Sequence, residues 1–127
     1  MLPEKPFGED ITNPHSRTMP SELHGTWLTE WNDMTAITSD RILRHENVER
    51  VVAVRFIDAE NIVLNSGLVV SSPQVAVVTL PADETKEQKY SLFYFGLSED
   101  GDSLVDLESM DLVLYRSELP PEDYIDY

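Results

Sequence analysis

Short β-prone segments separated by turn residues run from Gly25 to Arg116, and no helical pattern in this chain exceeds about two turns. The segments expected to form strands are residues 25–31, 34–38, 41–45, 50–57, 61–65, 74–80, 89–97, 102–107 and 111–116, with residues 68–70 as a short continuation of 61–65. Turn signals such as Asn32-Asp33 and Asp100-Gly101 stand between them. About eight short antiparallel strands at this spacing indicate a sandwich or a closed barrel, so the sequence predicts an all-β fold.

The 127 residues are enough for one ordinary domain with its own core. We expect a flexible, Pro-rich arm over residues 1–20, a barrel domain over residues 21–117 and an acidic tail over residues 118–127. Ser21 after Pro20 predicts a short helical turn before the first strand, because serine is a good N-cap. The prolines at 120 and 121 should keep the tail out of any sheet.

No apolar run approaches the roughly 18 residues that span a bilayer, so no membrane insertion is expected. The first residues contain no apolar stretch typical of a signal peptide, which favours a cytoplasmic protein, or a periplasmic one if a leader has been removed. There is no cysteine, which excludes disulfides, thiolate zinc sites and cysteine nucleophiles.

The chain is strongly acidic, with 24 acidic residues against nine basic ones and a net charge of −15. Thirteen of these acids, with only three bases, fall in residues 81–127. Such a surface repels the phosphates of nucleic acids and attracts basic partners, so direct nucleic acid binding is not expected. The acidity is also explained by solubility or by adaptation to a salty cytoplasm.

A resemblance to a known group rests on Gly25-Thr26-Trp27, which is similar to the Gly-X-Trp signature of lipocalin-like barrels, the calycin group. In that group a short helical turn precedes the first strand, and the tryptophan lies across the closed end of the barrel. A basic residue on the last strand packs on the tryptophan ring. The resemblance therefore implies an antiparallel up-and-down barrel of about eight strands, with Arg116 as the partner of Trp27. The lipocalin middle motif, with its Thr-Asp pair, has no clear match, so a more distant small barrel fits better.

No constellation of residues indicates catalysis. The three histidines, His15, His24 and His45, lack the spacing of a metal triad, and Glu99-Asp100-Gly101-Asp102 lacks the ligand spacing of a calcium loop. Neither a Gly-rich phosphate loop nor a Gly-X-Ser-X-Gly elbow is present. We therefore expect a non-enzymatic protein without a catalytic residue, metal or cofactor.

Two kinds of binding remain open. The first is a small apolar molecule held in the barrel, for which Trp31, Tyr90 and Tyr94 are the candidate ligand-binding residues. Alternation in the aromatic segment places Phe93 and Phe95 on one face, with Tyr90, Leu92 and Tyr94 on the other.

The second is a basic protein that this chain inhibits or neutralises, as an immunity protein does, or toward which it imitates nucleic acid. Its candidate contacts are in the tail: Glu122, Asp123, Tyr124 and Tyr127. Neither the ligand, the partner nor the oligomeric state follows from the sequence.

Overall fold

The structure is a computed structural model that describes residues 17–44, 46–58, 60–108 and 112–125. Nine strands and two short 3-10 helices make up the described chain. In order they are η1 (Ser21–Leu23), β1 (Gly25–Leu28), β2 (Met34–Ile37), β3 (Arg41–Arg44), β4 (Asn47–Ile57), β5 (Ile62–Val63), β6 (Val69–Pro81), β7 (Ser91–Ser98), β8 (Ser103–Asp106), β9 (Leu112–Ser117) and η2 (Pro121–Asp123). Within the described ranges, no helix has the length and apolar character needed to cross a lipid bilayer.

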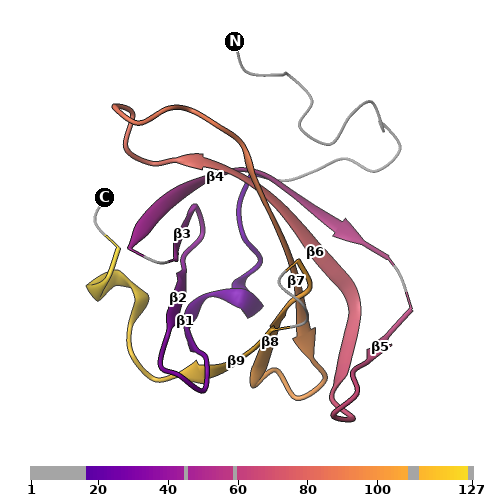
Figure 1. The fold of residues 1–127 in the computed structure, drawn as a ribbon. Helices are drawn as coiled ribbons and strands as arrows, with labels where there is room; N and C mark the ends of the chain where they lie inside the picture. The colour runs from indigo at the N-terminus through magenta and orange to yellow at the C-terminus, as the bar shows by residue number, and fades with distance from the viewer. Residues whose placement is uncertain (1–16, 45, 59, 109–111, 126–127) are drawn as a thin grey trace.

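Eight of the strands form a closed antiparallel up-and-down barrel. The hydrogen-bonded order is β4-β3-β2-β1-β9-β8-β7-β6, and pairing of β4 with β6 closes the ring. β5 adds a short hairpin to the beginning of β6. In Figure 1, η1 lies within the ring of strands, at the end from which β1 starts. Closure pairs the edges of β4 and β6 that an open sheet would leave free, and the all-β barrel predicted from the sequence is confirmed.

The first strand is shorter than the sequence predicts. β1 ends at Leu28, and Trp31 lies in the turn that follows instead of on the face of Trp27. The buried Thr29 hydroxyl accepts the backbone N–H groups of Trp31 and Asp33. A side chain that hydrogen-bonds nearby backbone in this way replaces ladder pairing with a turn.

Two irregularities occur in the long strands β4 and β6, which lie across the ring from β1 and β9. In β4, Val52 is an extra residue, since Val51 pairs with Thr79 while Ala53 pairs with Val78. Such a bulge reverses the alternation of side chains, so Val54 and Phe56 point inward after it. β6 is one strand across residues for which the sequence suggested two, and its pairing with β7 is interrupted between Ser71 and Val75.

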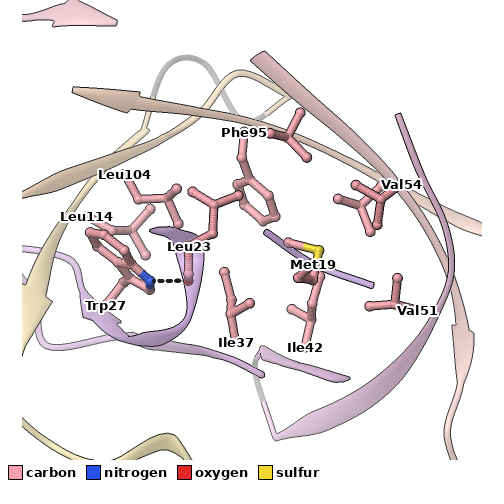
Figure 2. Packing of buried hydrophobic residues seen from close by; sticks show 12 residues of the cluster. Met19, Leu23, Trp27, Ile37, Ile42, Val51, Val54, Phe95, Leu104 and Leu114 are labelled. Carbon is pink, nitrogen blue, oxygen red and sulfur yellow. Dashed lines mark hydrogen bonds between the residues drawn. The ribbon is translucent and has the colours of Figure 1, made fainter. Parts of the chain in front are cut away.

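The core fills the middle of the barrel. Twelve buried apolar residues form one cluster, and Figure 2 shows that Leu23 of η1 and Met19 extend into it beside strand residues such as Ile37 and Phe95. Phe93 and Phe95 stack at 5.6 Å between ring centroids, which shows that the inward face of β7 is the phenylalanine face. The middle of the barrel is therefore packed with side chains.

Both flanking segments contact the barrel where the structure describes them. Met19, at the end of the predicted arm, is buried, and its N–H donates to the Ser39 carbonyl at 2.7 Å. Residues 1–16 of that arm lie outside the described residues. The tail stays out of the sheet, but Thr26 donates to the Leu119 carbonyl at 2.7 Å, and Ile125 is buried. Residues 17–20 and 119–125 thus extend the packed domain.

An ion pair crosses the barrel at the end opposite η1, which we call the far end. Arg44 of β3 and Asp106 of β8 form it, and their strands are four steps apart in either direction round the ring. Asp106 is only 1% exposed, and the Arg44 guanidinium lies 5.9 Å from the Phe93 ring centroid. A buried carboxylate needs such a partner because leaving it unpaired away from water is costly.

Replacement of Asp106 by Asn should lower the free energy of unfolding by about 3 kcal/mol, because the partly buried Arg44 loses its charge partner. Urea unfolding monitored by circular dichroism measures this change. Asp102→Asn, at the exposed start of the same hairpin, is the matched control and should change stability by less than about 0.5 kcal/mol. The double variant Arg44→Met/Asp106→Leu should recover most of the loss. Equal stability of the wild type and Asp106→Asn would contradict the assigned role of the pair.

Candidate binding pocket at the η1 end

A pocket of about 620 Å³ lies at the η1 end of the barrel. Its walls come from η1, the end of β4, the start of β6 and the turn between β7 and β8. The volume is within the range of about 300–1,000 Å³ typical of small-molecule sites.

The floor of the pocket is apolar. Leu23 from η1, Phe56 from β4, Val75 from β6 and Leu97 from β7 line it. Phe56 and Val75 are register partners, so their side chains share the inward face. Leu23 and Val75 belong to the core cluster, whereas Phe56 keeps 44% of its surface exposed. The pocket is therefore an open continuation of the packed core.

The part of β6 whose pairing with β7 is interrupted, between Ser71 and Val75, forms one side of the pocket. Ser71, Ser72 and Pro73 line it, and the peptide bond between Ser72 and Pro73 is cis. Two hydrogen bonds hold this segment. The Ser72 N–H donates to the Asn61 side chain at 2.9 Å, and the side-chain amide of the buried Gln74 donates to the Ser71 carbonyl at 3.4 Å. The strand therefore leaves its partner β7 here without becoming a free loop.

Gly96 on β7 lets the start of β6 approach closely. A Cβ atom at this position would lie 2.1 Å from Cγ1 of Val70, which is far inside van der Waals contact. The packing of Val70 over Gly96 fixes β6 just before the interruption begins. A strand glycine with this role marks close approach of another chain segment.

Arg116 ties two walls of the pocket together. Its guanidinium carbon lies 4.2 Å from the ring centroid of Trp27, which is fully buried and donates its indole N–H to the Leu23 carbonyl at 3.0 Å. The same guanidinium donates to the carbonyls of Glu22 at 2.9 Å and Gly101 at 3.2 Å. One side chain of β9 thus fastens both η1 and the β7–β8 turn.

The turn η1 is held mainly by backbone and by residues from outside it. The sequence suggested a serine N-cap, but Pro20 occupies the cap position and no side chain caps the turn. Just after the end of η1, Arg116 also donates to the His24 carbonyl at 3.2 Å. Gly25 follows with φ of +134°, a conformation that side chains disfavour, and a Cβ there would lie 3.4 Å from the guanidinium. The glycine of the Gly-Thr-Trp motif is needed for this geometry.

Three exposed acidic residues line the pocket, and we call them its rim: Glu22, Glu99 and Asp100. Hydrogen bonds from the Ser98 hydroxyl and from the backbone N–H of Asp102 lower the pKa of Asp100, so its carboxylate is charged at neutral pH. No basic side chain is among the residues that line the pocket. Over the described part of the chain, no group of three or more His, Cys, Asp or Glu residues is arranged to hold a metal ion.

The three predicted ligand-binding residues do not meet in this pocket. Trp31 is 68% exposed in the turn between β1 and β2, and Tyr94 lies on the face of β7 opposite Phe93 and Phe95. Tyr90 is half-buried just before β7 begins. None of the three lines the η1-end pocket.

The predicted partner-binding residues lie at the other terminus of the domain. Glu122 and Asp123 are exposed in η2, and Tyr124 is 41% exposed directly after it. Pro121 and Glu122 border a hollow of about 270 Å³ with His24 and the end of β2. Tyr127 lies outside the described residues.

Sequence reasoning missed the residues that line the pocket. Phe56 points inward only because of the extra residue Val52, and a bulge in a Val-rich segment leaves no clear signal. The serine-proline interruption before Gln74 was visible but suggested a turn between two strands. Glu99 and Asp100 were considered only as part of a turn and as members of a rejected calcium loop.

Comparison of the chain with protein-family models, with curated proteins and with solved structures finds no match. The barrel architecture is compatible with a calycin-like fold. Membership of the lipocalin group stays a prediction.

Replacement of Arg116 by Met should lower the free energy of unfolding by about 2 kcal/mol, because charged hydrogen bonds and the contact with Trp27 are lost. A double-mutant cycle with Trp27→Phe, measured by urea unfolding with circular dichroism, should give a coupling energy of about 1 kcal/mol. Arg41→Met is the control, since Arg41 pairs with the half-exposed Asp40 and such pairs contribute little. A coupling energy near zero would show that the stacked geometry does not stabilise the barrel.

Proposed function

We propose that this chain is a non-enzymatic binding protein that holds a small apolar molecule in the η1-end pocket. The observation that carries the proposal is the apolar floor of a 620 Å³ hollow that is continuous with the core. Apolar surface that stays open to water in a folded domain gains free energy when a ligand covers it. Phe56, a large aromatic side chain that remains 44% exposed inside a concave site, is the main such surface.

The proposed site differs in place from the one that a calycin-like barrel suggests. The resemblance predicts that the end crossed by the tryptophan is closed, yet the pocket lies at this same end. η1 is only three residues long, and the interrupted start of β6 does not close over it. The far end holds instead the ion pair of Arg44 with Asp106 and a smaller hollow of about 320 Å³.

In this proposal, the acidic surface attracts positively charged molecules over long range. A basic protein as the principal partner stays a prediction. The exposed Trp31 and Tyr124, both beside acidic residues, are where such a partner would find aromatic contacts.

A neutral apolar fluorophore, N-phenyl-1-naphthylamine, should bind at one saturable site with enhanced emission. Phe56→Ala should weaken its affinity about tenfold, since losing roughly 50 Å² of apolar contact corresponds to about 1.3 kcal/mol. Leu92→Ala is the matched control, because Leu92 is 52% exposed on β7 but does not line the pocket. It should leave the affinity unchanged. Equal effects of the two substitutions, or no saturable binding, would refute the proposed site.

A further inference from the structure

The charges around the pocket are all of one sign. Glu22 lies on one side of it, and Glu99 and Asp100 lie on the other, in the turn between β7 and β8. Among the described residues, Arg41 pairs with Asp40 and Arg44 pairs with Asp106, and neither ion pair involves these three acids. Within the described ranges, none of the three forms an ion pair with a basic side chain.

Arg116 is a basic residue that contacts the walls of the pocket. Arg116 donates to the backbone carbonyls of Glu22 and Gly101, which both line the pocket, but the arginine side chain itself does not. Its guanidinium is stacked on Trp27 and its donors are directed at carbonyl oxygens. It fixes the walls of the pocket, and its side chain is not among the residues that line it.

The hollow at the far end provides an internal comparison. Arg44, Lys86 and Glu49 line it, so bases outnumber acids there. The same acidic chain thus builds one hollow with a mixed lining and one whose charged lining residues are all acidic.

Resting on the proposed function, we propose that the η1-end pocket selects ligands that carry one positive charge on an apolar body, that is, small organic amines in their ammonium form. The apolar body covers Phe56, Val75 and Leu97, and the ammonium group stays at the rim near the carboxylates. Ser71 and Ser72 also line the pocket, and a serine hydroxyl can accept a hydrogen bond from an ammonium group even while it donates one, as that of Ser72 does to Asp58 at 3.4 Å. An anionic ligand of the same shape is repelled by the same three charges.

The test uses three ligands of one chain length, decylammonium, 1-decanol and decanoate, each displacing N-phenyl-1-naphthylamine at pH 7 and low salt. Decylammonium should displace the fluorophore at a concentration about tenfold lower than decanol, and decanoate should be weaker than decanol. Added salt should reduce the preference for decylammonium, because the rim is exposed and screened by ions. It should leave the displacement by decanol nearly unchanged.

The double variant Glu22→Gln/Glu99→Gln tests whether the acidic residues at the rim cause the preference for decylammonium over decanol. It should reduce the decylammonium preference to about threefold or less while the affinity for decanol stays constant. Glu84→Gln/Glu87→Gln is the matched control: it removes the same charge from exposed positions between β6 and β7 that do not line the pocket. This control should retain the preference.

The outcomes separate this inference from the proposed function. If the fluorophore binds saturably but all three ligands displace it equally, the selection for amines is wrong and the apolar pocket stands. An equal loss of preference in both double variants would assign it to overall charge, which also overturns the inference. Without saturable binding of the fluorophore, the proposed function and the inference fail together.

Discussion

The contact of Arg116 with Trp27 connects the parts of this molecule that the sequence separates. Trp27 is on the first strand of the barrel and Arg116 on the last, and the two are register partners across the β1–β9 pairing. The guanidinium covers the indole face and also binds carbonyl groups of η1 and of the β7–β8 turn. One side chain therefore links the β1–β9 pairing, η1 and the β7–β8 turn.

This arrangement explains why a short N-terminal turn can remain ordered. A three-residue 3-10 helix has almost no stability of its own, since formation of a single helical turn fixes several residues for very few hydrogen bonds. Here the Leu23 side chain is buried in the core, and the Leu23 carbonyl accepts a hydrogen bond from the Trp27 indole. Arg116 donates to the carbonyls of Glu22 and His24. Tertiary contacts supply what the local sequence lacks.

The two ends of the barrel differ in the side chains found there. At the far end a cation and an anion from opposite strands meet across the interior, next to Phe93. At the η1 end apolar side chains are left uncovered and acids surround them. A ligand with an apolar body and a positive charge complements the second end in both respects, whereas the first end is already neutralised internally.

The architecture was predictable because the strands follow from local patterns. Alternation placed Phe93 and Phe95 correctly on one face, and Asp100-Gly101 marked the hairpin between β7 and β8. The Gly-Thr-Trp motif indicated the start of the barrel. Each of these signals spans a few neighbouring residues, so no knowledge of distant contacts was required.

The pocket and the ion pair were not predictable for the opposite reason. Phe56 faces inward because one extra residue, Val52, reverses the alternation of β4, and the reversal is defined only by the pairing with β6. Arg44 and Asp106 are 62 positions apart in the chain and meet only when the ring closes. Trp31 was assigned to a strand face because alternation continued through it, but the Thr29 side chain ends the strand first.

The central claim, that a ligand occupies the η1 end rather than the far end or the outer surface, is tested most directly by methyl NMR during titration with N-phenyl-1-naphthylamine. The account predicts that the largest chemical-shift changes and intermolecular NOEs involve the methyl groups of Leu23, Val75 and Leu97. The methyl groups of Leu112, at the far end, should not change. NOEs confined to Leu112, or to the outward-facing Leu92, would contradict the placement of the site.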